Sequence, residues 1–207
     1  MTTLNGMNVA ILAADGFELA ELVEPRKALD QAGATTLIVS PAKGEVQGWK
    51  HFDKADRFKV DVPLADADPS DFDALLLPGG VANPDQLRML PEAVQFVRAF
   101  FDSDKPVAVI CHGPWTLIDA GVAKGRKLTS WPSLRADLTN AGARWEDREV
   151  IVDEQLVSSR KPADLPAFNS RMLEVFAASR DRSPAGAARA GTAPRPKRPG
   201  DLRGGTH

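Results

Sequence analysis

The first 110 residues alternate short apolar runs with segments of helical periodicity, and this alternation restricts the fold most strongly. The apolar runs predict buried strands at residues 7–13, 35–40, 74–77 and 106–110. Between them, apolar residues recur at helical spacing from Leu19 to Leu29, and Pro91 occupies the first turn of a second expected helix that ends at Phe101. Such alternation is typical of βαβ units. We therefore expect an α/β fold: a flavodoxin-like three-layer α/β/α sandwich with a mostly parallel central sheet.

The rest of the ordered chain is expected to complete the same domain. The more polar residues 44–63 predict a hairpin and a loop, and residues 149–152 and 156–159 predict a second hairpin. Helices are expected at 114–120, 133–141 and about 163–178. A length of 207 residues with 43% hydrophobic content suits one domain, which we place at residues 1–178.

Residues 179–207 differ in composition from the rest of the chain. They contain five Gly, four Pro and one large aliphatic residue, and seven Arg or Lys against two Asp give them a net charge of +5. Too little apolar surface is available to offset the entropy of ordering, so we expect a disordered basic tail. The tail has no aromatic residue on which a base could stack, and nucleic-acid binding is expected to be weak at most.

The single cysteine, Cys111, lies where the run Val107 to Ile110 ends and Gly113-Pro114 opens a helix. A thiol at such an elbow faces the positive end of a helix dipole and the imidazole of His112, and both are expected to lower its pKa. The alternative is an inert core thiol, since free cysteine is often buried. One cysteine also excludes an internal disulfide, which favours a reducing cytoplasmic location.

Three candidate groups follow strand ends: Glu18, the pair Gly79-Gly80, and Cys111-His112. In open α/β sheets ligands bind at the carboxyl ends of the strands, so these groups are expected to line one crevice. His112 is predicted to act as a base and to donate its backbone N–H to an oxyanion, or to be a structural histidine that donates to a backbone carbonyl. Gly79 and Gly80 would let backbone N–H groups approach a substrate carbonyl, or form only a turn that needs positive φ. Glu18 would hold a proton beside the thiolate if burial raises its pKa, or would only stabilise a helix start.

Several classes of site are excluded or disfavoured by the sequence. It has no dinucleotide-binding glycine motif, no phosphate loop and no zinc-protease motif. With one Cys and three His, a structural zinc site is improbable, so we expect neither a metal nor another cofactor. No apolar stretch at the N-terminus reaches the length of a secretory or membrane-spanning segment, and we expect no membrane association.

The segments Asp15 to Glu18, Leu77 to Gly80, Ala108 to Pro114, Thr129 to Pro132 and Val157 to Leu165 together resemble the PfpI intracellular protease family. This family belongs to the class I glutamine amidotransferase-like superfamily, which includes the parkinsonism-linked deglycase. The resemblance implies Cys111 as nucleophile, His112 as its partner, Glu18 as the acid, and an oxyanion site from the N–H groups of Gly80 and His112. It also implies a homodimer in which an acid after the Gly-Gly loop orients the histidine of another subunit; Asp85 is the nearest match.

Two functions therefore remain from the sequence. The first is a cysteine-dependent stress-response hydrolase or lyase that attacks a carbonyl of a peptide, an α-oxoaldehyde or an α-oxoaldehyde adduct. The second is a non-catalytic redox sensor or holdase chaperone that uses the oxidisable thiol of Cys111. Glutamine amidotransferase chemistry is disfavoured because only His207 follows His112 in the chain.

Overall fold

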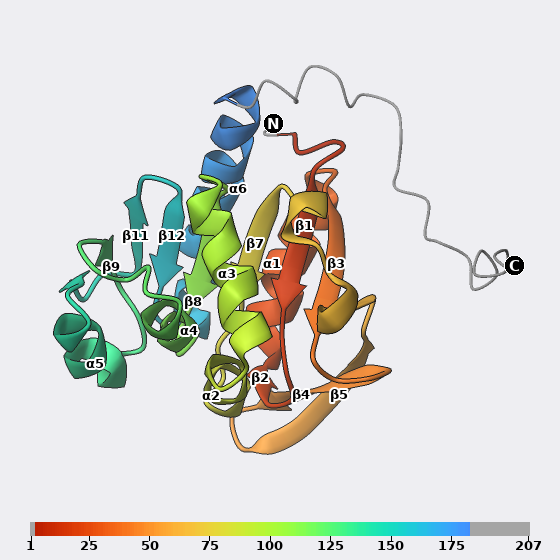
Figure 1. Cartoon of the computed structure of the whole chain (residues 1–207), viewed down its shortest axis with the longest axis horizontal. Helices are drawn as coiled ribbons and strands as arrows, with labels where there is room; N and C mark the ends of the chain where they lie inside the picture. Colours follow the sequence, from red (N-terminus) through yellow and green to blue (C-terminus); the bar gives the residue numbers. More distant parts are fainter. Residues whose placement is uncertain (1–2, 183–207) are drawn as a thin grey trace, which may run out of the picture.

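The computed structural model describes residues 3–182 and contains a seven-stranded sheet with helices on both faces (Figure 1). The strand order is β11-β12-β8-β7-β1-β3-β6, and every neighbouring pair is parallel except β11 and β12. The strands are β1 (Asn8–Leu12), β3 (Thr35–Ser40), β6 (Val62–Pro63), β7 (Ala74–Leu77), β8 (Val107–Ile110), β11 (Val150–Asp153) and β12 (Leu156–Ser159). The prediction of a three-layer α/β/α fold with a mostly parallel sheet is confirmed.

Alternate residues of the central strands enter two separate cores. Leu75 and Leu77 of β7 face a core shared with helix α3 (Pro91–Asp102), helix α4 (Pro114–Asp119) and helix α5 (Arg135–Asn140). Leu76 faces the opposite core, formed with α1 (Leu19–Gln31) and α6 (Leu165–Arg182). Because both faces are covered, β1, β7 and β8 are almost entirely buried, which explains their uninterrupted apolar sequences.

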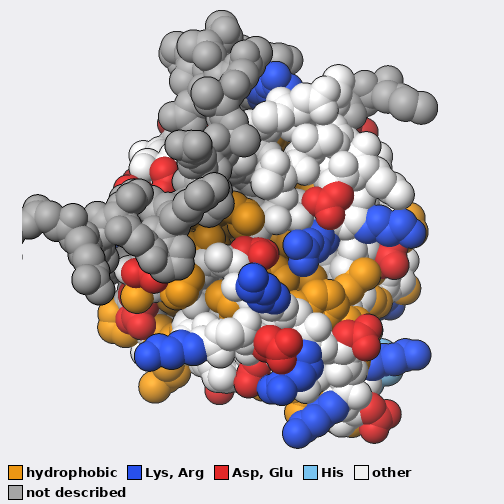
Figure 2. Space-filling view, turned by 90° about the vertical axis from the view of Figure 1, so that its right-hand side faces the viewer, with side chains coloured by type: hydrophobic (Ala, Val, Ile, Leu, Met, Phe, Trp, Pro, Cys, Tyr) orange, Lys and Arg blue, Asp and Glu red, His pale blue; other side chains and the backbone are white. Residues whose placement is uncertain are grey.

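A smaller sheet extends from the end of the domain at which the parallel strands finish (Figure 1). It consists of β2 (Phe17–Glu18), β4 (Glu45–Lys50) and β5 (Asp53–Lys59), with β4 and β5 antiparallel as the predicted hairpin. On the face of the molecule shown in Figure 2, the coloured acidic and basic side chains are interspersed. A further pair, β9 (Lys127–Leu128) and β10 (Arg144–Trp145), forms its own two-stranded sheet, and the N–H of Lys127 in β9 donates to Asp153 of β11.

Two helices differ from the sequence expectations. Helix α2 (Ala82–Arg88) was not predicted, because Pro84 interrupts its pattern; a proline is tolerated there since it lies in the first turn. Helix α6 continues to Arg182, so residues 179–182 of the expected disordered tail are helical. Residues 183–207, which hold most of that tail, lie outside the described residues. Among residues 3–182, no helix is long and apolar enough to cross a membrane.

Candidate active site

Cys111 lies at a sharp turn between β8 and α4, as the sequence predicted. Its φ is +63°, a conformation that non-glycine residues adopt rarely and that concentrates at functional sites. Two backbone hydrogen bonds hold the turn: the N–H of Cys111 donates to Ser159 O at 3.1 Å, and Trp131 N–H donates to Cys111 O at 2.9 Å. The residue is only 7% exposed. The fold therefore fixes the thiol in a strained position at a strand end.

The Gly79-Gly80 loop packs directly against this turn. A Cβ atom on Gly79 would lie 2.6 Å from Cys111 Cβ and 2.5 Å from Glu21 Oε2, so only glycine fits. Gly80 has a φ of +79°, and a Cβ there would collide with Gly16 O and approach Glu18 N to 2.7 Å. The structure thus brings together the loops that follow β1, β7 and β8.

The acid beside the thiol is Glu21, not Glu18. Glu21 is fully buried, accepts a hydrogen bond from Gly79 N–H at 3.0 Å and lies beside Cys111, since both side chains border the same position at Gly79. Glu18 instead accepts a hydrogen bond from the N–H of His51, at the tip of the β4–β5 hairpin, at 3.0 Å. The sequence expectation for Glu18 is therefore corrected. The reason is that Glu18 belongs to β2 and precedes α1, whereas Glu21 lies on the buried face of the helix.

Burial changes the protonation of this pair. It raises the pKa of Glu21 to about 8, with a smaller contribution from the charge of Glu18. Burial also raises the pKa of the Cys111 thiol, and a negative charge on Glu21 raises it further. The expectation of a lowered pKa for the Cys111 thiol is thus wrong. Helix α4 has only six residues, and the imidazole of His112 supplies no positive charge when it is neutral, so neither offsets the effect of burial. The two groups titrate as a coupled pair.

Two backbone N–H groups favour the charged form of the sulfur. The backbone N–H groups of Gly80 and His112 lie near the sulfur and lower the pKa of the Cys111 thiol, against the effect of burial. These are the two groups expected to form an oxyanion site. Their convergence on the sulfur places two donors beside the position at which a carbonyl carbon would be attacked.

The imidazole of His112 contacts the thiol and two tryptophans. Its Nδ1 lies 3.2 Å from Cys111 Sγ. The ring stacks on Trp131 with centroids 5.9 Å apart and meets Trp115 edge-to-face at 5.3 Å. Burial lowers the pKa of His112, so the ring is neutral at pH 7 and able to accept a proton.

Sequence reasoning missed Glu21 and gave no role to the two tryptophans. Glu21 carried a signal: it shares one helix face with Pro25 and Leu29, at spacings of four and eight residues, where a carboxylate is unexpected. Trp131 lies in the segment Thr129 to Pro132 that contributes to the family resemblance, but no local pattern places it beside His112, which it reaches through a long-range contact.

The predicted Asp85 is not part of this cluster within one chain. It is exposed and lies in the first turn of α2. Its predicted role concerns a second subunit and stays a prediction. Over residues 3–182 there is no group of three or more His, Cys, Asp or Glu side chains that could hold a metal ion.

Comparison with known proteins gives a consistent result. Residues 7–175 match the DJ-1/PfpI family. The chain is 47% identical over 170 residues to deglycase PfpI of Pyrococcus furiosus, covering 82% of this chain and 99% of that protein. It is 44% identical over 172 residues to general stress protein 18 of Bacillus subtilis, covering 83% and 98%. The structure of Drosophila melanogaster DJ-1beta is similar with a TM-score of 0.75 and 26% identity, covering 83% of this chain and 90% of that one.

Proposed function

Since this chain belongs to the DJ-1/PfpI family, we propose that it is an enzyme in which the Cys111 thiolate attacks a carbonyl carbon. The observation that carries this proposal is the convergence of four groups on one strained thiol. The Glu21 carboxyl and the N–H groups of Gly80 and His112 lie beside Cys111 and act on the pKa of its thiol, and the imidazole of His112 lies 3.2 Å from its sulfur. A core thiol without a chemical role needs none of these partners.

The nucleophile is activated by removal of one proton from the Glu21–Cys111 pair. Since the pKa of Glu21 is raised to about 8, its carboxyl keeps a proton at neutral pH and does not repel a thiolate. The neutral imidazole of His112 accepts the thiol proton through Nδ1. The protonated Glu21 carboxyl then donates a hydrogen bond to the sulfur, together with the N–H groups of Gly80 and His112.

The chemical step forms one bond and displaces one electron pair. The sulfur bonds to the carbonyl carbon, and the π electrons move to the carbonyl oxygen, which accepts hydrogen bonds from the backbone N–H groups of Gly80 and His112. His112 returns its proton to the oxygen or to a departing amine. Water, or an internal proton shift within an α-oxoaldehyde, completes turnover.

We propose a small α-oxoaldehyde, or its adduct with an amine, as the substrate rather than a folded protein. Cys111 is only 7% exposed and two indole rings flank His112, which leaves access for a small carbonyl. A relative 47% identical to this chain is named a deglycase, which agrees with this choice. Cleavage of peptides is the alternative for the same thiolate.

The test is a paired assay of wild type and Cys111→Ala. Both proteins are incubated with methylglyoxal, with its adduct on an amino-acid amine, and with an unfolded peptide. We expect the wild type to consume the first two, and Cys111→Ala to be inactive. Turnover of the peptide alone would support the protease alternative. Equal behaviour of both proteins with every substrate would contradict an enzymatic role and favour the redox sensor or holdase.

We also propose that the enzyme is a homodimer whose subunits complete each other's site. Asp85 is exposed on α2 at the end of the sheet that carries Cys111, which leaves it available to a second subunit. In this arrangement Asp85 of the partner subunit orients His112. The proposal follows the family resemblance, and the mixed-subunit experiment in the Discussion tests it.

A further inference from the structure

Asn83 is a buried polar residue with no role in the reaction steps proposed above. It lies near the start of α2 and has no exposed surface. Its Oδ1 accepts a hydrogen bond from Ala14 N–H at 2.7 Å, and its Nδ2 donates to Pro78 O at 2.9 Å and to Gly79 O at 3.0 Å. The side chain therefore joins the loop after β1 to the Gly-Gly loop after β7.

The two carbonyls that Asn83 binds belong to the two peptide groups that face Glu21 and Cys111. Pro78 O shares a peptide group with the N–H of Gly79, which donates to Glu21 Oε2 at 3.0 Å. Gly79 O shares a peptide group with the N–H of Gly80, which lies near Cys111 and lowers the pKa of its thiol. In a planar trans peptide the C=O and N–H point in opposite directions, and residues 3–182 contain no cis peptide bond. A carbonyl held by Asn83 on one side thus aims its N–H at the pair on the other.

The orientation of the amide itself is fixed. Its oxygen meets a backbone N–H and its nitrogen meets two carbonyls, so a flipped amide would lose all three hydrogen bonds. The loop that it holds has no side chains of its own to restrain it at Gly79 and Gly80, and glycine is the most flexible residue type. Donation to a peptide carbonyl also polarises that peptide and strengthens its N–H as a donor.

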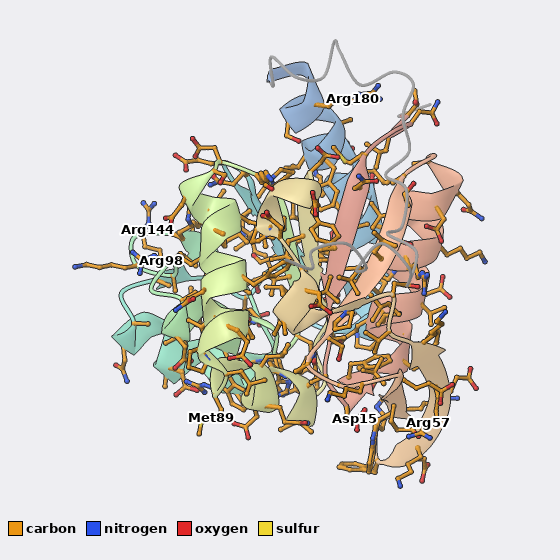
Figure 3. All side chains as sticks on the ribbon, turned by 45° about the vertical axis from the view of Figure 1, so that its right-hand side comes forward. Asp15, Arg57, Met89, Arg98, Arg144 and Arg180 are labelled. Carbon is orange, nitrogen blue, oxygen red and sulfur yellow. The ribbon has the colours of Figure 1, made fainter. Side chains whose placement is uncertain are left out.

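We propose that Asn83 is a positioning residue that sets the direction and donor strength of the Gly79 and Gly80 N–H groups. It does not touch the reacting atoms; it acts through the two peptide groups. This inference rests on the proposed function for its catalytic meaning, but its effect on the thiol can be measured without any substrate. In Figure 3 the labelled residues Asp15 and Met89 lie at the same end of the sheet. Asp15 follows Ala14 in the loop after β1, and Met89 follows α2.

The experiment compares Asn83→Ala and Asn83→Asp with the wild type. Asn83→Asp keeps the shape of the side chain and replaces both N–H donors with an acceptor. The matched control is Gln86→Ala: Gln86 lies on the same helix and donates to Asp15 O and Ala82 O, neither of which belongs to the Gly-Gly loop. Each protein is alkylated with iodoacetamide from pH 5 to 10, its steady-state kinetics are measured, and its thermal midpoint is recorded.

We expect both Asn83 variants to alkylate about tenfold more slowly at pH 7, the effect of a rise of about one unit in the apparent pKa of the thiol. We also expect kcat to fall about 100-fold with a smaller change in KM, as for loss of an oxyanion donor. Gln86→Ala should match the wild type in both. Folded Asn83 variants with wild-type alkylation profiles would overturn the proposal, since a purely structural role would leave those profiles unchanged.

Two outcomes are separated by design. If no substrate is turned over but the alkylation profiles shift, the proposed function fails and the role of Asn83 stands. If Cys111-dependent turnover occurs and the Asn83 variants retain it, the role of Asn83 fails. Should neither variant fold, NMR couplings across hydrogen bonds in labelled wild type decide: couplings from Asn83 Nδ2 to the carbonyl carbons of Pro78 and Gly79 support the proposal, and their absence overturns it.

Discussion

Glu21 Oε2 accepts a hydrogen bond from the backbone N–H of Gly79 at 3.0 Å, although 58 residues separate the two in sequence. This bond holds a buried carboxyl of α1 against the loop that follows β7, beside Cys111. A carboxyl in that position, with its pKa raised to about 8, holds a proton next to the sulfur at neutral pH. The hydrogen bond to Gly79 therefore explains why the acid beside the thiol is Glu21, and the raised pKa explains how it holds a proton there.

The first prediction separates Glu21 from Glu18. We expect Glu21→Leu to lower kcat/KM about 100-fold or more, because the hydrogen bond that the protonated carboxyl donates to the sulfur is lost. Glu18→Leu should lower it less than about threefold, because within residues 3–182 that carboxyl accepts a hydrogen bond only from the exposed backbone N–H of His51. Steady-state kinetics of both variants test this. The reverse order of effects would return the role of the acid to Glu18.

The second prediction concerns the pH dependence of stability. The pKa of Glu21 is raised from 4.5 to about 8 on folding, so below about pH 4.5 the carboxyl is protonated in both states. As the pH rises towards 8, the unfolded chain loses this proton before the folded one, and stability falls by up to about 1.4 kcal/mol per pH unit. The total loss is on the order of 5 kcal/mol.

Urea unfolding of Cys111→Ala and of Cys111→Ala with Glu21→Gln, from pH 4.5 to 8, measures this effect. The shared Cys111→Ala change removes the coupled thiol. The protein that keeps Glu21 should lose stability relative to its partner as the pH rises. A difference between the two that stays constant over this range would show that Glu21 is not buried as a neutral acid.

The third prediction concerns His112 and Trp131. Burial lowers the pKa of His112, and the stacked Trp131 ring provides part of that burial. Activity that requires a neutral imidazole should therefore persist below pH 6.5 in the wild type. Trp131→Ala should move this acidic limit upwards, towards 6.5. Trp145→Phe is the control, since Trp145 donates to Ser130 Oγ and stacks with Arg135 instead; an equal shift in both variants would refute the effect.

The fourth prediction tests the close packing at Gly79. A methyl group there would lie 2.5 Å from Glu21 Oε2 and 2.6 Å from Cys111 Cβ, so Gly79→Ala should destabilise the fold by about 1–3 kcal/mol and abolish turnover. Gly44→Ala is a control with a φ of +89° but no heavy atom within 4 Å. It should cost about 1 kcal/mol and leave turnover intact. Chemical denaturation and activity assays measure both; full activity in Gly79→Ala would contradict the geometry.

The fifth prediction tests the shared site. Homodimers of Cys111→Ala and of Asp85→Ala should each be nearly inactive. A mixed dimer pairs the intact Cys111 of one subunit with the intact Asp85 of the other, so mixing the two variants should restore activity in up to about half of the mixed dimers' sites. Activity is compared before and after the variants are unfolded and refolded together. A monomer in sedimentation, or Asp85→Ala with wild-type activity, would exclude the shared site.

The strands and the thiol elbow were predictable because their signals are local. The bounds predicted at residues 74–77 match β7, since a buried parallel strand favours a continuous apolar run. The bounds predicted at 35–40 and 156–159 also match β3 and β12. The turn at Cys111 followed from a buried strand that meets Gly113-Pro114. Each of these signals lies within a few residues of the feature that it predicts.

The acid and its supports depended on contacts between distant segments. Residues Phe17–Glu18 pair with Gly48–Trp49 of the hairpin, and this pairing keeps Glu18 in a strand, so that α1 begins at Leu19. The helix phase then turns Glu21, not Glu18, towards Cys111. Asn83 likewise gains its role only where the loops after β1 and β7 meet.

The sequence by itself determined the α/β fold, the strand-end position of Cys111 and the neighbouring His112. The tertiary structure alone decided which carboxyl adjoins the thiol, what protonation it has and which side chain holds the Gly-Gly loop. The physical reason is that strand and turn preferences are set by neighbouring residues, whereas burial, pKa and hydrogen-bond partners are set by segments that meet only in the folded chain.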